Sequence, residues 1–234
     1  MDPLSERLRV RARELLAAEY AEQRSQEWLE LRENMITASD VASAIGENRY
    51  ESPENFIKKK VLRLKWSGNA ATEHGTRLEP IARDMYDQKF NKKSHEIGIV
   101  RHPRYPWLGG SPDGITEDGL LIEIKCPLTR KIEPKVPKHY MPQIQLLLEI
   151  TDLDECDFIQ YRPPDEFVVV RVQRDRSWFE THFPVIEKIW NKIVEGRDTG
   201  LCEIKEDPTP FDPYFKTKID CQVVWEGAVT RVSS

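Results

Sequence analysis

Hydrophobic residues recur at helical spacing through the first third of the chain. The N-terminal positions Leu4, Leu8, Leu15, Leu16 and Tyr20 stand among charged residues and predict a helix over the first thirty residues. The polar cluster at 37–40 is typical of a helix start and predicts a short helix over 41–45. Ser52-Pro53 begins another helix, which continues to residue 62, because proline is tolerated at the first helical position. A further helix is predicted over 72–90, and Pro80 is expected to start, kink or interrupt it.

The pattern changes near residue 96. Short apolar runs at 97–100, 107–110 and 120–125 predict three strands, and Asp118-Gly119 is a strong hairpin signal before the third. We expect these strands to form one meander over 96–126. The later segments predict a helix over 139–150, strands over 156–162 and 166–172, and a helix over 178–194 closed by Gly196. This succession predicts an α/β domain with a mixed central β-sheet flanked by α-helices.

Composition and charge narrow the class of protein. The 234 residues are 39% hydrophobic and 32% charged, as in globular proteins. The sequence contains neither an apolar run long enough to cross a bilayer nor a secretory leader, so we expect a soluble intracellular protein without a membrane partner. The net charge of −5 excludes a basic coat over the whole surface, although a local basic path remains compatible with it. Four scattered cysteines, Cys126, Cys156, Cys202 and Cys221, predict reduced thiols and no zinc site.

The chemically informative segment is Ser111-Pro112-Asp113-Gly114, followed after the hairpin signal by Glu123-Ile124-Lys125. Side chains alternate along a strand, so Glu123 and Lys125 share a face, and the turn folds Asp113 back beside Glu123. Two carboxylates and an ammonium group suit Mg²⁺-assisted phosphodiester hydrolysis. The alternative is a solvated Glu–Lys pair on a strand edge. We favour the functional interpretation because the Pro-Asp pair, the turn and the apolar flanks occur together.

These residues resemble the PD-(D/E)XK nuclease motif and, more closely, the lambda exonuclease and YqaJ-type viral recombinase family. Five blocks carry the resemblance: Trp28…Leu31-Arg32…Ile36-Thr37-Ala38-Ser39, Gly75-Thr76-Arg77-Leu78-Glu79, Ser111-Pro112-Asp113-Gly114, Glu123-Ile124-Lys125-Cys126-Pro127 and Tyr140-Met141-Pro142-Gln143-Ile144-Gln145. They occur in the family's order between residue 28 and about residue 150. The resemblance implies a PD-(D/E)XK nuclease domain over 28–196. An N-terminal helical extension over 1–27 precedes it, and a tail over 197–234 stays unassigned.

The resemblance also implies residue roles at the catalytic site. Asp113 and Glu123 hold Mg²⁺, which Mn²⁺ can replace, and the backbone carbonyl of Ile124 adds a ligand. Lys125 is the catalytic lysine. Glu79 reaches from its helix toward a second metal or its water. The residues alone favour a different interpretation of Glu79, as an exposed helical glutamate beside Arg83 at i, i+4 spacing; the family block reverses that preference.

A second set, Arg32, Ser39, Ser111 and Gln143, matches the family's pocket for a terminal 5′-phosphate. Arginine offers a fork to phosphate, and hydroxyl and amide groups add neutral donors. Each residue has an alternative: Ser39 as a helix N-cap, Gln143 as a solvated helix residue, Arg32 as the partner of an acid on its own helix. The basic loop 125–139 and the run Lys58-Lys59-Lys60 are either a path for the DNA backbone or solvated faces.

By resemblance, the protein is a Mg²⁺-dependent exonuclease that digests one strand of linear double-stranded DNA from its 5′ end. The 3′ single strand that remains serves recombination with a single-strand annealing partner. A ring-shaped homotrimer and a viral or prophage origin are the family expectations. The alternatives are an endonuclease or an RNA-acting nuclease on the same fold, or a binding module without catalysis. The joint presence of Asp113, Glu123 and Lys125 argues against the binding module.

Overall fold

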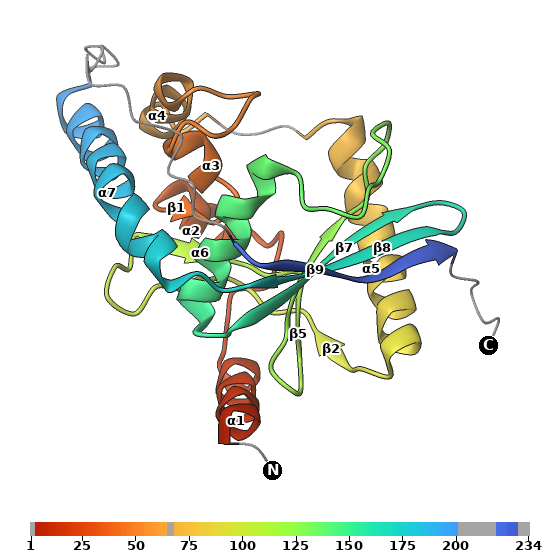
Figure 1. Cartoon of the computed structure of the whole chain (residues 1–234). Coiled ribbons are helices and arrows are strands. Elements are labelled where there is room, and N and C mark those ends of the chain that lie inside the picture. Colours follow the sequence, from red (N-terminus) through yellow and green to blue (C-terminus); the bar gives the residue numbers. More distant parts are fainter. Residues whose placement is uncertain (1–2, 65–67, 201–218, 229–234) are drawn as a thin grey trace.

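Two sheets organise the chain, for which a computed structural model describes residues 3–64, 68–200 and 219–228 (Figure 1). The larger sheet has the order β2-β5-β6-β7-β8-β9 and is built from Ser94–His95, Gly114–Thr116, Leu121–Lys125, Glu155–Arg162, Glu166–Gln173 and Cys221–Ala228. The smaller sheet has the order β1-β4-β3 and is built from Ile36–Thr37, Leu108–Gly110 and Val100–Arg101. The helices are α1 (Pro3–Ala17), α2 (Gln26–Glu33), α3 (Val41–Ala44), α4 (Pro53–Val61), α5 (Ala70–Phe90), α6 (Met141–Thr151) and α7 (Arg176–Thr199), with a 3-10 turn η1 at Lys138–Tyr140.

The larger sheet is mixed, as the element order predicts. Strands β6 and β7 are parallel, and the other neighbours in this sheet are antiparallel. The crossover between β6 and β7 passes through α6, because parallel strands need a long connection. Successive β6 residues enter different clusters: Leu121 packs with α6 and α7, and Ile122 packs with α5. The sheet is therefore covered on both faces, and the predicted α/β class is confirmed.

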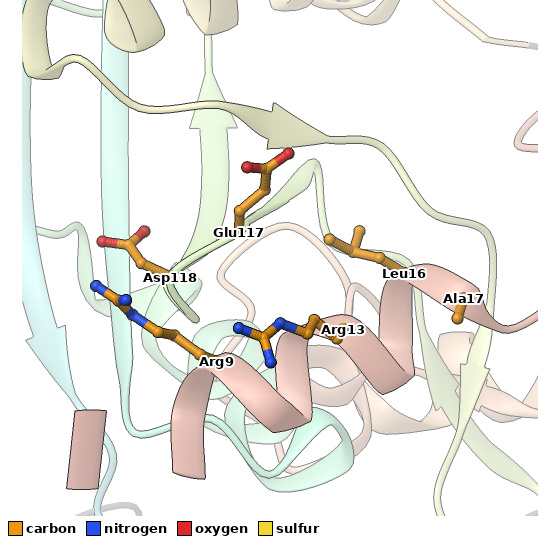
Figure 2. A pocket seen from close by; sticks show the side chains of 6 residues that line it. All are labelled: Arg9, Arg13, Leu16, Ala17, Glu117 and Asp118. Atoms are coloured by element: carbon orange, nitrogen blue, oxygen red, sulfur yellow. The ribbon is translucent and has the colours of Figure 1, made fainter. Parts of the chain in front are cut away.

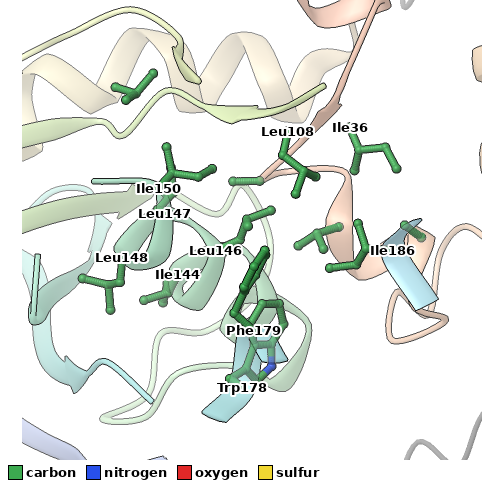
Figure 3. Packing of buried hydrophobic residues seen from close by; sticks show 14 of the residues in the cluster. Ile36, Leu108, Ile144, Leu146, Leu147, Leu148, Ile150, Trp178, Phe179 and Ile186 are labelled. Atoms are coloured by element: carbon green, nitrogen blue, oxygen red, sulfur yellow. The ribbon is translucent and has the colours of Figure 1, made fainter. Parts of the chain in front are cut away.

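Helix α6 forms the centre of the main core. Its apolar residues lie on every side, which is typical of a fully buried helix, and the buried members include Ile144, Leu146, Leu147, Leu148 and Ile150. They pack against Ile36 and Leu108 of the small sheet and against Trp178, Phe179 and Ile186 of α7 (Figure 3). Burying each large aliphatic side chain contributes about 1.5–3 kcal/mol. The position of α6 is thus fixed from several directions.

The predicted three-strand meander over 96–126 is wrong. Strand β4 pairs with β1 and β3, whereas β5 and β6 belong to the larger sheet. The glycines of β4 allow neighbouring side chains to approach its backbone closely. A Cβ at Gly110 would lie 2.6 Å from Leu147 of α6, and one at Gly109 would lie 2.8 Å from Met35. The pair serves close packing.

Several helix boundaries also differ from the sequence prediction. The first helix is two helices, α1 and α2, separated by a turn in which Arg24 has φ 70° and Ser25 caps α2. Pro80 lies inside α5, which it neither starts nor interrupts. Helix α7 passes through the expected stop at Gly196, which is buried, and ends at Gly200 with φ 68°. Tertiary packing on the core keeps these helices continuous.

The unassigned tail contributes strand β9, which pairs with β8 along the edge of the larger sheet. The ammonium of Lys89 on α5 lies 3.4 Å from the centre of the Trp225 ring on β9. Residues 201–218, which include Cys202, and residues 229–234 lie outside the described residues. The three other cysteines, Cys126, Cys156 and Cys221, are free thiols. In the described ranges, no helix has the length and apolarity to span a membrane.

Helix α1 packs on the turn of the β5–β6 hairpin. Gly119 at this turn has φ 93°, and a Cβ there would lie 2.8 Å from Leu8. A recess of about 620 Å³ opens beside this contact, and its lining consists of Arg9, Arg13, Leu16, Ala17, Glu117 and Asp118 (Figure 2). The recess lies at the closed end of the hairpin. Asp113 lies at the open end, so the recess is separate from the candidate active site.

Candidate active site

The β5–β6 hairpin brings Asp113 next to the middle of β6. Gly114 pairs with Ile122, and the backbone N–H of Ile124 donates to Oδ2 of Asp113 at 2.7 Å. The turn at Asp118-Gly119 therefore folds Asp113 back beside β6, as the sequence predicts. Asp113 is oriented by the strand that carries Glu123.

Glu123 and Lys125 lie on the same face of β6 and form an ion pair. The Glu123 side chain is 0% exposed, so the alternative of a solvated pair on a strand edge is wrong. Gln143 of α6 donates from Nε2 to Oε1 of Glu123 at 2.5 Å. The other oxygen, Oε2, is buried and has no hydrogen-bond partner among the described residues. An unpartnered buried carboxylate oxygen is costly in a protein interior unless another group binds it.

Glu79 approaches from α5 and is held by two arginines. Arg83 contacts Oε1 at 3.3 Å, at the expected i, i+4 spacing, and Arg24 contacts Oε2 at 3.3 Å. Both arginines also contact Glu96, at 3.1 Å and 3.8 Å. The Glu79 side chain is only 14% exposed, so it is not the exposed helical glutamate of the alternative interpretation. Arg24 could not be found from sequence, because it stands in a turn 55 residues away from Glu79.

The carboxyl groups of this site are buried close enough together to raise one another's pKa values. Burial and the neighbouring Asp113 raise the pKa of Glu123 to about 8 and that of Glu79 to about 7. Burial also raises the pKa of Asp113. Burial opposes the charge of Lys125, but the carboxylates of Glu123 and Asp113 outweigh it and raise the pKa of the ammonium. A site with this excess of buried carboxylate is suited to a cation.

These donors fit a magnesium ion. Mg²⁺ is usually bound by one or two carboxylates together with water and substrate phosphate, and Asp113 and Glu123 supply two. The buried Oε2 of Glu123, which has no hydrogen-bond partner among the described residues, can serve as a ligand atom for the ion. No three His, Cys, Asp or Glu side chains in the described part of the chain converge into a preformed metal cluster. Glu79 is held by Arg24 and Arg83, and it lies near enough to Asp113 for that carboxylate to raise its pKa.

Trp28 joins three of the four residues assigned to the phosphate pocket. The guanidinium of Arg32 lies 4.4 Å from the centre of the Trp28 ring and donates to Oγ of Ser39 at 3.0 Å. The indole Nε1 of Trp28 donates to Oγ of Ser111 at 3.0 Å. Gln143, the fourth residue, is hydrogen-bonded to Glu123 instead. The spacing of Trp28 and Arg32 was a usable signal for this role, since residues four apart share a helix face.

The alternatives for Arg32, Ser39 and Gln143 are not what the structure contains. Arg32 stacks on Trp28 rather than pairing with an acid of its own helix. The residue that precedes α3 as its N-cap is Asp40, and Ser39 bonds to Arg32. Gln143 points at a buried carboxylate and is not a solvated residue. Of the three, Gln143 contacts the candidate catalytic site directly, and Arg32 and Ser39 contact each other.

The lysines of the run Lys58-Lys59-Lys60 have different surroundings: Lys58 is exposed, whereas Lys59 and Lys60 make specific contacts. Lys60 is buried, and its ammonium donates to the backbone oxygens of Arg32 and Met35 at 2.8 Å each and contacts Asp40 at 2.8 Å. Lys59 pairs with Glu51 at 2.7 Å. Burial alone would raise the pKa of Asp40, but Lys60 and Arg32 hold it well below its usual range. Lys60 therefore supports the backbone under Arg32 and is not part of a DNA path.

Comparisons with known proteins agree with this geometry. Residues 27–154 match the YqaJ-like viral recombinase domain. An uncharacterized protein of Acanthamoeba polyphaga mimivirus is 32% identical over 158 residues, which cover 59% of this chain and 29% of that protein. A protein of African swine fever virus (strain Badajoz 1971 Vero-adapted) is 30% identical over 156 residues, which cover 53% of this chain and 45% of that protein. The chain thus matches less than half the length of these two viral relatives.

The fold has a counterpart among solved structures. The crystal structure of an alkaline exonuclease (LHK-Exo) from Laribacter hongkongensis superimposes with a TM-score of 0.65 and 27% sequence identity. The match covers 75% of this chain and 95% of that chain. The mixed sheet with its flanking helices is thus the PD-(D/E)XK-like fold that the sequence blocks imply. Because the family match extends over more than half of its residues, the chain belongs to the YqaJ-like viral recombinase domain family.

Proposed function

We propose that this protein is a metal-dependent exonuclease that digests one strand of linear double-stranded DNA from the 5′ end and leaves a 3′ single strand. The observation that carries the proposal is the fully buried carboxylate of Glu123. It lies between Lys125 and Gln143 with one oxygen unpartnered among the described residues, on the hairpin that presents Asp113. The similarity to a protein described as an alkaline exonuclease supports the exonuclease assignment.

Asp113, Glu123 and the carbonyl of Ile124 would hold Mg²⁺, with Mn²⁺ as a substitute. When bound, the ion supplies an activated water and stabilises the leaving oxygen of the phosphodiester. Lys125 keeps its proton, because the adjacent carboxylates raise its pKa, and its ammonium neutralises charge that develops on the scissile phosphate. Gln143 orients Glu123 through the hydrogen bond to Oε1, and the N–H of Ile124 orients Asp113. Glu79 orients a water or a second ion, from a position set by Arg24 and Arg83.

Arg32, Ser39 and Ser111 form the pocket for the terminal 5′-phosphate, and Gln143 contributes from the Glu123 side. A guanidinium binds a phosphate through two parallel hydrogen bonds, and the two hydroxyls add further donors. Trp28 holds Arg32 by its ring and Ser111 by its indole N–H, so it keeps the pocket assembled. Ser111 is two residues from Asp113, which places the pocket next to the catalytic hairpin in the chain. Such an arrangement favours phosphorylated 5′ ends.

The biological setting belongs to the same proposal. The viral relatives support a virus- or prophage-encoded protein that acts in the host cell. The recombinase family supports a partner that anneals single strands. We propose a homotrimeric ring as the active assembly. Light scattering of the purified protein measures its mass directly, and a monomer at working concentrations would contradict the ring.

The decisive experiment uses a linear duplex labelled on one strand, with either a 5′-phosphate or a 5′-hydroxyl. We expect stepwise loss from the phosphorylated end with Mg²⁺ and no loss with EDTA. A closed circular duplex serves as the control, because an exonuclease cannot start without an end. Cleavage of the circle would replace the proposal with an endonuclease, and digestion of an RNA duplex in preference to DNA would replace it with an RNA-acting enzyme. Binding without cleavage under Mg²⁺ or Mn²⁺ would leave a binding module.

A further inference from the structure

A series of aromatic rings leads away from the catalytic lysine toward solvent. The ammonium of Lys125 lies 5.2 Å from the centre of the Tyr140 ring. The rings of Tyr140 and His139 are 4.1 Å apart, and those of His139 and Tyr50 are 6.0 Å apart in an edge-to-face contact. We name Tyr140, His139 and Tyr50 the aromatic ridge. It joins the 3-10 turn η1 to the loop between α3 and α4, which are distant in sequence.

The outer end of the aromatic ridge is open to ligands. Tyr50 is 71% exposed, the highest value among the exposed large hydrophobic residues of the described chain. The loop does not depend on the Tyr50 ring for its shape. The backbone N–H of Tyr50 donates to Oδ1 of Asn48 at 3.0 Å, and Nδ2 of Asn48 donates to Oγ of Ser43 at 2.9 Å. An exposed ring on a loop that is braced by other groups is available for stacking.

The aromatic ridge lies in positive surroundings. The guanidinium of Arg49 lies 4.5 Å from the centre of the Tyr50 ring and bonds to the Tyr50 hydroxyl. Burial and, after it, the positive charges of Arg49, Arg130 and Lys125 lower the pKa of His139. Two acids stand on the α3–α4 loop: Glu51, which pairs with Lys59 at 2.7 Å, and Glu47, whose pKa is raised by burial against the opposing charge of Lys138. Rings interleaved with cations are the usual composition of single-strand binding surfaces, because the rings stack on bases and the cations meet phosphates.

We propose that the aromatic ridge binds unpaired nucleotides of a DNA strand next to the scissile phosphate, with bases stacked on Tyr50 and His139. The assignment to DNA rests on the proposed exonuclease function. Unpaired nucleotides are favoured over duplex, because bases within a duplex already stack on their neighbours and offer no free face. Arg49 meets the phosphate backbone beside Tyr50. Tyr140 connects this surface to Lys125, so that the strand continues into the catalytic site.

The test measures binding rather than cleavage. Fluorescence anisotropy with a labelled single-stranded DNA oligonucleotide is recorded in EDTA, so that hydrolysis does not contribute. We expect Tyr50→Ala to weaken binding roughly 5- to 100-fold, the range for loss of one stacked base. Tyr50→Phe keeps the ring and is expected to stay within about twofold of wild type on the same reasoning. His139→Ala is expected to weaken binding in the same direction as Tyr50→Ala.

Val10→Ala on α1 is a matched control, since Val10 is 43% exposed and lies on a different element. Unchanged affinity of Tyr50→Ala, or an equal loss in Tyr50→Phe, would overturn the stacking role. A greater loss on blunt duplex than on single strands would overturn the assignment to unpaired nucleotides. Tighter binding of RNA of the same sequence would overturn the assignment to DNA. Because no metal is used, a wild-type protein without exonuclease activity would refute the proposed function and leave the binding result standing.

Discussion

Gln143 and Glu123 meet across the boundary between helix α6 and strand β6, where the amide Nε2 donates to the carboxylate Oε1 at 2.5 Å. The carboxylate is fully buried, and its other oxygen is without a partner in the described chain. One oxygen is therefore oriented and the other is left available. This division fits a residue that must hold a cation in one direction. Helix α6 is itself fixed in the core, so the amide is presented by a rigid element.

We expect Gln143→Ala to weaken the apparent affinity for Mg²⁺ by about 10- to 100-fold, as is typical when a group that orients a metal ligand is lost. The loss should appear as a higher Mg²⁺ concentration for half-maximal rate in a titration of linear-duplex digestion. Gln173→Ala, at an exposed position on β8, is the control. An unchanged Mg²⁺ requirement in Gln143→Ala would show that Glu123 needs no orientation from α6.

Glu123→Gln is expected to lower the rate of cleavage by at least about 10²–10³-fold, because the neutral amide replaces a charged metal ligand. The fold should survive, because the amide oxygen can still accept from Lys125 and the buried excess of carboxylate is reduced. Cleavage rate and thermal unfolding are measured on the same preparation. Full activity of folded Glu123→Gln protein would remove Glu123 from the catalytic site.

Arg32→Lys is expected to reduce the preference for 5′-phosphorylated ends by about 10-fold or more, because lysine cannot supply the two-pronged contact or the stack on Trp28. The measurement is the ratio of digestion rates on 5′-phosphate and 5′-hydroxyl duplexes. Arg13→Lys on α1, where the side chain is 68% exposed, is the matched control. If both variants keep the wild-type ratio, the 5′-phosphate is recognised elsewhere.

Lys60→Ala is expected to lower the free energy of unfolding by about 3–5 kcal/mol, because it leaves the buried Asp40 charge without its partner. The variant also removes the donor to two backbone oxygens. Urea unfolding of the full chain is the measurement. Lys58→Ala, at an exposed position in the same run, should change stability by less than about 0.5 kcal/mol. Equal effects of the two substitutions would mean that Lys60 is not structural.

The pH dependence of stability should include a contribution from Glu149. The nearby His102, whose Nε2 lies 3.6 Å from Oε1 of Glu149, and Arg174, which contacts Oε2 at 2.6 Å, lower the pKa of Glu149 from the ordinary 4.5 to about 2 against the opposing effect of partial burial. A carboxyl group whose pKa is lower in the folded state stabilises the protein at pH values above its ordinary pKa. This contribution is lost as the pH falls toward 2. Glu149→Gln should therefore flatten the fall in urea stability over that acidic window. An unchanged slope would show that Glu149 titrates normally in the folded protein.

The β5–β6 hairpin could be predicted from the sequence because its determinants are local. The Asp118-Gly119 turn sets the pairing, and strand alternation then puts Glu123 and Lys125 on one face. The main helices were predicted for the same reason, since periodicity within one element reports its buried side. Where local signals conflicted with packing, they misled: α7 continues through Gly196 to Thr199, and Pro80 neither starts nor interrupts α5.

Contacts between elements had no local signal, and only the tertiary structure decided them. The sequence determined the α/β class, the hairpin and the chemical groups of the candidate site. The fold determined that Lys60 is buried beneath Arg32, that Trp28 links Arg32 to Ser111, and that Gln143 orients Glu123. It also brought Tyr50 beside His139. The physical reason is that turns and periodicity act between residues close in the chain, whereas side-chain partners across elements depend on how helices and sheets pack.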